Sequence, residues 1–233
     1  MADGQMVEFA SNGQQAQGYL ATPASGSGPA VAVIQEWWGL VDHIRQVCDR
    51  LAGEGFVALA PDLYHGEKTA EPDEAGKMMM ELEIERAARD MSGAVDYLLG
   101  HEAVTSSKVG AVGFCMGGGL VLVLAARNGD KVGAAVPFYG VFKGETPDLS
   151  GITCPVLGHF GDEDEFTPVE QARELETAII EQAGVECTFH FYRGAGHAFY
   201  NDDRPEAHHP EHAARAWELT LQFLRANLEN SET

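Results

Sequence analysis

Short, continuous apolar runs recur along the chain, and segments with helical periodicity separate them. An unbroken apolar run is typical of a strand buried on both faces, whereas apolar residues at every third or fourth position indicate an amphipathic helix. Strands are predicted at 30–35, 56–60, 109–114, 133–139, 155–160 and 187–192. Helices are predicted at 41–52, 78–99, 120–127, 169–182 and 210–228. Because strands alternate with helices, we expect an α/β fold, with a mostly parallel central sheet and helices on both faces.

Two segments depart from this alternation. Residues 6–10 and 17–21 are separated by Ser-Asn-Gly, which predicts an antiparallel hairpin at the start of the chain. Residues 65–77 are expected to form a mobile excursion before the long helix at 78–99. That helix carries three consecutive methionines, 78–80, and its inner side is expected to comprise Met79, Leu82, Ile84, Ala88, Met91 and Val95. We interpret the methionines as helical core rather than as the lining of a binding site.

The strand ending at Phe114 runs directly into Cys115, in the pattern Gly113-x-Cys115-x-Gly117. A glycine on either side of a central Ser or Cys allows the sharp strand-to-helix turn called a nucleophile elbow. The helix N-terminus favours a thiolate, and the N–H of Met116 is free to face an oxyanion. The alternative is a buried cysteine in the glycine-rich turn of a nucleotide-binding domain. No Gly-x-Gly-x-x-Gly supports that alternative here.

Partners for the cysteine follow two later strands. The strand ending at Phe160 leads into an acidic loop with Asp162, Glu163 and Asp164, and the strand ending at Tyr192 leads into a loop with His197. Nucleophile, acid and histidine therefore occur in the chain order of the α/β-hydrolase triad. Since the carboxyl ends of parallel strands share one edge of the sheet, we expect the three loops to meet there.

Composition limits the function further. The formal charge is −21, from 15 Lys and Arg against 36 Asp and Glu, and the absence of a basic stripe argues against nucleic acid as a partner. Four well-separated cysteines without a Cys-x-x-Cys pair suit a reducing compartment. Without a long apolar segment or a signal-like N-terminus, we expect a cytoplasmic protein that does not contact membranes. The length of 233 residues predicts one domain spanning 1–233.

The whole chain resembles the dienelactone hydrolase family, the carboxymethylenebutenolidases of the α/β-hydrolase fold. The resemblance rests on Gln35-Glu36-x-x-Gly39, Pro61-Asp62-Leu63-Tyr64, Gly113-Phe114-Cys115-Met116-Gly117-Gly118, Tyr139-Gly140-Val141, Gly161-x-x-Asp164-x-Phe166-x-Pro168 and Gly196-His197-x-Phe199. It implies a small-molecule lactone or ester as substrate and no cofactor. It also implies Cys115 as nucleophile, His197 as base and acid, and Asp164 as the residue that orients His197. Asp162 and Glu163 are the alternatives for this last role.

The resemblance gives Glu36 a role as well. The matching glutamate of the family lies near the thiol and takes its proton when substrate binds. The backbone N–H groups of Trp37 and Met116 would then form the oxyanion hole, in agreement with the general arrangement of the fold. A plain loop carboxylate on the surface is the alternative interpretation of Glu36.

The substrate pocket departs from the family pattern. Dienelactone hydrolases hold a substrate carboxylate with two arginines, but one of these positions is Asn201 here, and residues 70–77 contain no arginine at the other. The cations that remain as substitutes are Arg86, Arg89, Arg193 and Arg204. Aromatic residues that we expect to line a more apolar pocket are Trp37, Trp38, Tyr64, Tyr139 and Phe199.

Other functions remain as alternatives. The same triad suits a carboxylesterase or thioesterase for uncharged substrates, and a non-catalytic homologue is the third possibility. His208, His209 and His212 have a spacing that suits a metal, but no neighbouring Cys or carboxylate cluster completes a site, so we expect no metal.

Overall fold

The computed structural model describes residues 4–11 and 13–228. Its eight strands form one sheet in the order β1-β2-β4-β3-β5-β6-β7-β8. The strands are β1 Gln5–Ser11, β2 Gln14–Ala21, β3 Gly28–Ile34, β4 Val57–Pro61, β5 Val104–Phe114, β6 Val132–Phe138, β7 Val156–Gly161 and β8 Cys187–Tyr192. β1 pairs antiparallel with β2 and β2 antiparallel with β4, while the pairings from β4 to β8 are parallel. The expected hairpin and the mostly parallel sheet are therefore confirmed.

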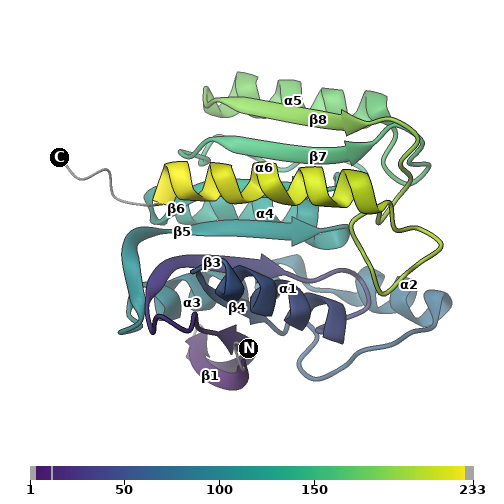
Figure 1. Cartoon of the computed structure of the whole chain (residues 1–233). Coiled ribbons are helices and arrows are strands. Elements are labelled where there is room, and N and C mark those ends of the chain that lie inside the picture. The colour runs from purple at the N-terminus through teal and green to yellow at the C-terminus, as the bar shows by residue number, and fades with distance from the viewer. Residues whose placement is uncertain (1–3, 12, 229–233) are drawn as a thin grey trace.

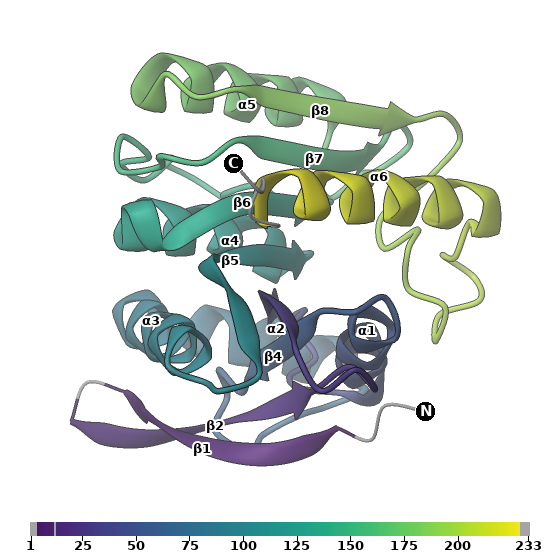
Figure 2. The same ribbon diagram turned by 60° about the vertical axis from the view of Figure 1, so that its left-hand side comes forward.

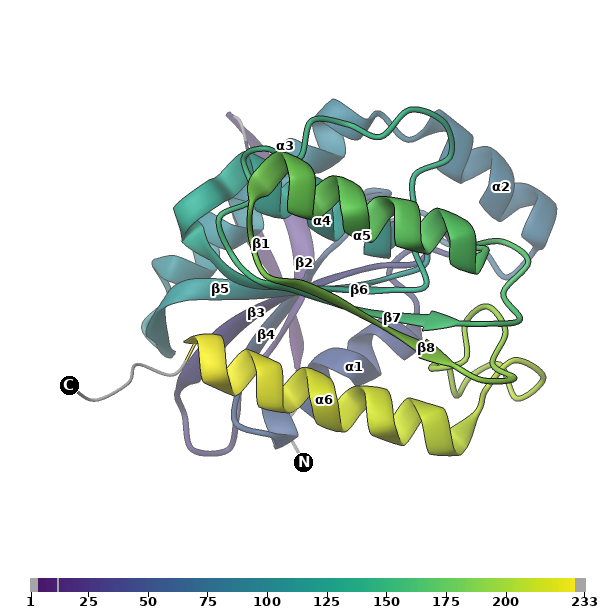
Figure 3. The same ribbon diagram turned by 90° about the horizontal axis from the view of Figure 1, so that it is seen from above.

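Helices cover both faces of this sheet. They are α1 Asp42–Gly53, α2 Pro72–Glu81, α3 Ile84–Leu99, α4 Met116–Asn128, α5 Val169–Ala183 and α6 Pro210–Leu228, with a short 3₁₀ turn at Gly129–Lys131. α1 and α6 lie on one face, and α3, α4 and α5 lie on the other (Figures 2 and 3). Ala30, Ala32 and Ile34 of β3 pack in the core toward α3 and α4, whereas Val31 and Val33 pack in the core toward α1 and α6. Burial on both faces explains the continuous apolar runs.

The parallel strands all point the same way, so their carboxyl ends lie together at one edge (Figure 1). The loops that follow β3, β5, β6, β7 and β8 emerge at this edge. In open α/β sheets, this edge is where functional groups gather.

The expected excursion and long helix take a different form. Helical residues begin at Pro72, and two helices, α2 and α3, replace the single helix predicted at 78–99. Leu82 and Glu83 separate them in extended conformations, with ψ angles of 115° and 98°. The assignment of the methionines to the core is wrong for Met80, which is 79% exposed, whereas Met78 and Met79 are half-buried. Ile84, which was expected on the inner side of the helix, is 49% exposed.

α4 begins at Met116, earlier than the predicted start of the helix at Leu120. Glycine disfavours a helix in isolation, but here the glycines let the first turn of α4 approach the sheet closely. A Cβ on Gly118 would lie 2.7 Å from the carbonyl oxygen of Phe138. Tertiary packing therefore overrides the low helix propensity of this segment. Among the described residues, no helix is both long and apolar enough to cross a membrane.

Candidate active site

Cys115 lies at the tip of a tight turn between β5 and α4. Its φ angle is 53°, a left-handed conformation that is unusual for a non-glycine residue, and its N–H donates to the carbonyl of Phe138 at 3.0 Å. The flanking glycines make this turn possible. A Cβ on Gly113 would lie 2.1 Å from the carbonyl oxygen of Gly117, and one on Gly117 would lie 2.4 Å from that of Ile34. The turn leaves the cysteine side chain partly exposed at the carboxyl edge of the sheet.

The loop after β8 brings His197 to the acid loop that follows β7. His197 Nδ1 lies 2.8 Å from Asp164 Oδ2, which is hydrogen-bonding distance. The other oxygen of Asp164 accepts from the N–H groups of Phe166 and Thr167 at 2.8 and 2.9 Å. Asp164 is 4% exposed, so these bonds hold an otherwise costly buried carboxylate in one orientation.

The two alternative acids have other surroundings. Asp162 is exposed and accepts a hydrogen bond from the N–H of Gly194 at 2.6 Å. Glu163 is exposed too, and its backbone N–H donates to Ala195 at 3.0 Å. Of the three acids, Asp164 is the one in contact with His197. Asp162 instead joins the acid loop to the histidine loop.

Protonation of His197 reflects opposing influences. Burial disfavours the imidazolium, but hydrogen bonds to Asp164 and Cys115 and the charges of both groups outweigh it, and raise the pKa of His197 to about 10. Cys115 is therefore one of the groups that act on the pKa of His197.

Glu36 follows β3 and is buried, with an exposed fraction of 1%. Its carboxylate accepts from Asn201 Nδ2 at 2.8 Å and from the hydroxyl of Tyr139 at 3.4 Å. Burial raises the pKa of Glu36, and the charges of His197 and Arg204 and both hydrogen bonds offset part of this rise. Glu36 is therefore not a surface carboxylate. It is a more basic carboxylate than usual, held close to His197.

Tyr139 links the parts of the site. It is fully buried with a φ angle of 38°, its ring lies 5.2 Å from that of His197, and its carbonyl accepts from the hydroxyl of Thr167 at 3.1 Å. Its hydroxyl bonds to Glu36, so Tyr139 lies beneath the site and holds its polar groups together. The sequence identified Tyr139 only as a pocket residue. The sequence signal for this role is the place of Tyr139 at the end of the predicted strand 133–139, at the same edge of the sheet as Glu36.

The N–H groups of Met116 and Trp37 both lie where the chain leaves a strand at the carboxyl edge. Met116 is the first residue of α4, so its N–H has no acceptor within the helix. Within 4–11 and 13–228, neither N–H donates to another protein group. Both are available to an oxygen atom of a ligand.

The other residues expected at the pocket differ in exposure. Phe199 and Asn201 are buried, with exposed fractions of 0% and 2%, and lie beneath the surface. Tyr64 donates its hydroxyl to the sulfur of Met116 at 3.4 Å and lines a cleft of about 240 Å³ beside α2 and α3. Trp38 is half-buried, and its ring packs edge-on against that of Trp37, with centroids 4.9 Å apart.

The arginines that were considered as substitutes have different surroundings. Arg204 has its guanidinium 5.6 Å from the centroid of the Trp38 ring, and its charge acts on Glu36. Arg86 lines the cleft beside Tyr64 together with glutamates. Arg193 is exposed and Arg89 half-buried. Arg204 is thus the arginine that the structure connects to Glu36.

The histidines near α6 make other contacts. The rings of His209 and His212 stack with centroids 3.9 Å apart, and His212 Nε2 lies 2.9 Å from the carbonyl oxygen of Arg193. Over the described part of the chain, no three His, Cys, Asp or Glu residues are grouped to hold a metal ion.

The sequence is similar to a known protein family and to several of its members. The model of the dienelactone hydrolase family matches residues 16–228. The "Putative carboxymethylenebutenolidase" of Aquifex aeolicus is 37% identical, with 97% of this chain and 99% of the relative covered. The "Probable 2-oxo-3-(5-oxofuran-2-ylidene)propanoate lactonase" of Bradyrhizobium is 34% identical, with 95% and 94% covered.

A solved structure agrees with these relatives. The crystal structure of a dienelactone hydrolase-like promiscuous phosphotriesterase from metagenomic libraries superposes with a TM-score of 0.86 at 25% identity, with 98% of this chain and 100% of that chain covered. The sheet order, the family match and these relatives all agree. The chain therefore belongs to the dienelactone hydrolase family, and is a carboxylic ester hydrolase with the α/β-hydrolase fold.

Proposed function

We propose that this enzyme hydrolyses lactones or activated esters through a triad of Cys115, His197 and Asp164. The observation that carries the proposal is the contact of His197 Nδ1 with Asp164 Oδ2 at 2.8 Å, at the edge of the sheet where the turn after β5 leaves Cys115 partly exposed. Nucleophile, base and orienting acid in this relation are the signature of covalent acyl transfer.

In the first half-reaction, the Cys115 thiolate attacks the carbonyl carbon, a C–S bond forms, and the carbonyl electron pair moves to oxygen. Collapse of this intermediate breaks the C–O bond, and the leaving alkoxide or enolate takes a proton from the His197 imidazolium. In the second, His197 takes a proton from water as the water attacks the thioester, and the thiolate leaves. The imidazolium and thiolate are regenerated, so protons balance over the cycle.

The oxyanion of each tetrahedral intermediate is assigned to the N–H groups of Met116 and Trp37. Two observations support this assignment. Neither N–H has a protein acceptor among the described residues, and the N–H of Met116 lies at the N-terminus of α4. Donors that are fixed in place before the reaction stabilise developing charge without reorganising.

Glu36 is assigned as the group that takes the thiol proton when substrate binds. Its burial supports this assignment, because a raised pKa makes the carboxylate a better proton acceptor. Once the proton has moved to Glu36, the thiolate and the His197 imidazolium form an ion pair. Glu36 returns this proton to Cys115 when the product leaves, so the next cycle starts from the same state.

Esterase or thioesterase activity toward uncharged substrates is the second candidate. The observation that favours it is the neutral amide of Asn201, which takes the position of a family arginine and whose Nδ2 is occupied by Glu36 at 2.8 Å. A buried amide with this partner offers no positive charge to a substrate carboxylate.

Hydrolysis of cis- and trans-dienelactone beside p-nitrophenyl esters of increasing chain length tests both candidates, with Cys115→Ala as the blank. Rapid opening of dienelactone that depends on Cys115 supports the lactonase and requires another cation for the carboxylate. Turnover of aryl esters alone supports the second candidate. Hydrolysis that persists in Cys115→Ala overturns the proposed mechanism.

A further inference from the structure

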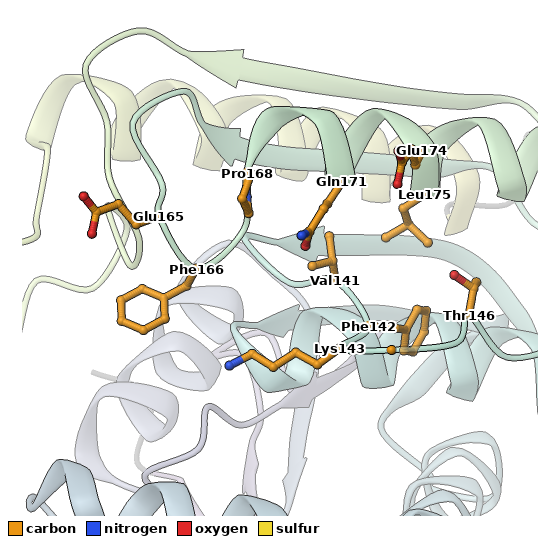
Figure 4. A pocket seen from close by; sticks show the side chains of 11 residues that line it. Val141, Phe142, Lys143, Thr146, Glu165, Phe166, Pro168, Gln171, Glu174 and Leu175 are labelled. Carbon is orange, nitrogen blue, oxygen red and sulfur yellow. The ribbon is translucent and has the colours of Figure 1, made fainter.

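A second cleft lies beside the acid loop, and Glu165, Phe166 and Pro168 of this loop line it. It has a volume of about 550 Å³ and is enclosed between the loop after β6 and the first turns of α5. Figure 4 shows Val141 and Gln171 facing each other in the middle, with Leu175 and Phe142 toward one end and Phe166 toward the other. This volume lies within the range of small-molecule sites, about 300–1,000 Å³.

One end of the cleft reaches the proposed base. The ring of Phe166 lies 5.2 Å from that of His197, and the Phe166 N–H donates to Asp164 at 2.8 Å. On the other wall, Val141 follows Gly140, where a Cβ would lie 2.1 Å from the carbonyl oxygen of Cys115. Both walls are thus continuous with the segments that hold the triad, so a molecule bound to Cys115 can extend along the cleft.

The walls are mixed, with apolar side chains beside polar and charged ones. Val141, Phe142, Pro168 and Leu175 contribute aliphatic and aromatic surface. Phe166 is 60% exposed, although a phenyl ring exposed to water forgoes the gain of burial. A ligand that covers this ring would recover that gain.

The charges around the cleft select against anions. Lys143 is the cation among the lining residues, and Glu165 and Glu174 oppose it. The formal charge of the whole chain is −21. Because the field of the protein also repels negative ligands, an anionic group gains little from Lys143 alone.

We propose that this cleft binds the uncharged aryl or alkyl arm of an ester substrate, while the ester carbonyl lies at Cys115. The inference rests on the proposed function, since the arm is attached to the carbonyl that Cys115 attacks. It adds a substrate class: esters with an extended, uncharged apolar group.

Binding of a dye tests the cleft without any turnover. The uncharged probe N-phenyl-1-naphthylamine and its anionic analogue 1-anilinonaphthalene-8-sulfonate are titrated by fluorescence, with excitation beyond the tryptophan band. In Gln171→Trp an indole fills the middle of the cleft, and in Glu170→Trp the same bulk is added to α5 outside the lining residues. Both positions are exposed, so both variants are expected to fold.

The wild type and Glu170→Trp are expected to bind the uncharged dye with the same affinity. Gln171→Trp is expected to bind it at least about tenfold more weakly, because the indole takes the place of dye atoms whose apolar contacts amount to more than two methylene groups. The sulfonate is expected to bind more weakly than the uncharged dye. Equal binding of the uncharged dye by both variants, or tighter binding of the sulfonate, overturns the proposal.

Ester hydrolysis then distinguishes an effect on substrate binding in the cleft from an effect on the reaction at Cys115. Gln171→Trp is expected to lower kcat/KM for p-nitrophenyl decanoate by about tenfold and to leave p-nitrophenyl acetate unchanged, since the short acyl group does not reach the indole. Equal losses on both esters contradict the cleft as the acyl site. Hydrolysis that survives in Cys115→Ala contradicts the proposed triad instead, whatever the dyes show.

Discussion

Asn201 donates a hydrogen bond from Nδ2 to Glu36 Oε2 at 2.8 Å, and both side chains are almost fully buried. The contact joins the loop after His197 to the loop after β3, which are 165 residues apart in the chain. Asn201 Oδ1 in turn accepts from the N–H of Asp203 at 3.0 Å, which fixes the direction of the amide. The bond favours the ionised form of Glu36, and therefore opposes the effect of burial.

Replacing Asn201 by alanine is expected to raise the pKa of Glu36 further. Glu36 accepts a proton only as a carboxylate, so the rate falls as pH falls through this pKa. The acid limb of the kcat/KM profile should therefore move to higher pH by about one to two units, the equivalent of one hydrogen bond to a charged group. A pH series on a p-nitrophenyl ester measures the shift.

The control for this profile is Glu36→Gln, which is isosteric and does not titrate. It should lower the rate and also remove the limb that Asn201→Ala shifts. If Asn201→Ala lowers the rate equally at all pH values, Asn201 does not act through the ionisation of Glu36.

Asp164→Asn should lower kcat by about 10²–10⁴-fold, because an amide both loses the charge that stabilises the His197 imidazolium and favours the wrong tautomer. The matched variant is Asp162→Asn, in the same loop, whose carboxylate bonds to Gly194 rather than to His197. It should keep most of the activity. Steady-state kinetics of the two variants measure both effects. A large loss of kcat in Asp162→Asn with a small loss in Asp164→Asn would assign the orienting role to Asp162.

Gly117→Ala is expected to destabilise the protein by about 2–4 kcal/mol or to prevent folding, because its Cβ would lie 2.4 Å from a carbonyl of β3 and cannot be accommodated without moving backbone. Gly53, at the end of α1, has no heavy atom within 4 Å of an added Cβ. Gly53→Ala should therefore stabilise the protein by about 0.5 kcal/mol through helix propensity. Urea unfolding compares the two, and equal effects would contradict the close contact of the elbow with the sheet.

The sequence was sufficient to predict the sheet and the three loops that carry Cys115, Asp164 and His197. Strands buried on both faces have no polar alternation, and the end of each apolar run marks the carboxyl edge. The break between α2 and α3 was not predictable, because Leu82 and Glu83 contain neither glycine nor proline and adopt extended angles through tertiary packing.

The role of Tyr139 was likewise hidden in the sequence. Its left-handed backbone and full burial depend on contacts from separate parts of the chain, since its N–H donates to His159 at 2.8 Å and its carbonyl accepts from Thr167 at 3.1 Å. An aromatic residue after a strand is equally typical of a pocket wall. Only the fold distinguishes the two roles.

His197 should make stability depend on pH in a defined direction. Its pKa rises from 6.5 to about 10 on folding, so its protonation stabilises the folded state fully below about pH 6.5, and this contribution disappears as pH rises toward 10. The free energy of unfolding of the wild type, measured with urea under reducing conditions, should therefore exceed that of His197→Gln most at low pH. The excess should shrink across this window.

His43 provides a control of opposite sign. Burial, followed by the charge of Arg50, lowers the pKa of His43 to about 4 from 6.5, so the folded state resists its protonation and loses stability as pH falls through this interval. Below pH 6.5, the free energy of unfolding of the wild type should therefore fall relative to that of His43→Gln. In the same pH range the contribution of His197 is complete and constant. A constant difference between wild type and His197→Gln from pH 6.5 to 10 would show that His197 is not protonated more readily in the folded state. This result would contradict the His197 imidazolium on which the proposed mechanism depends.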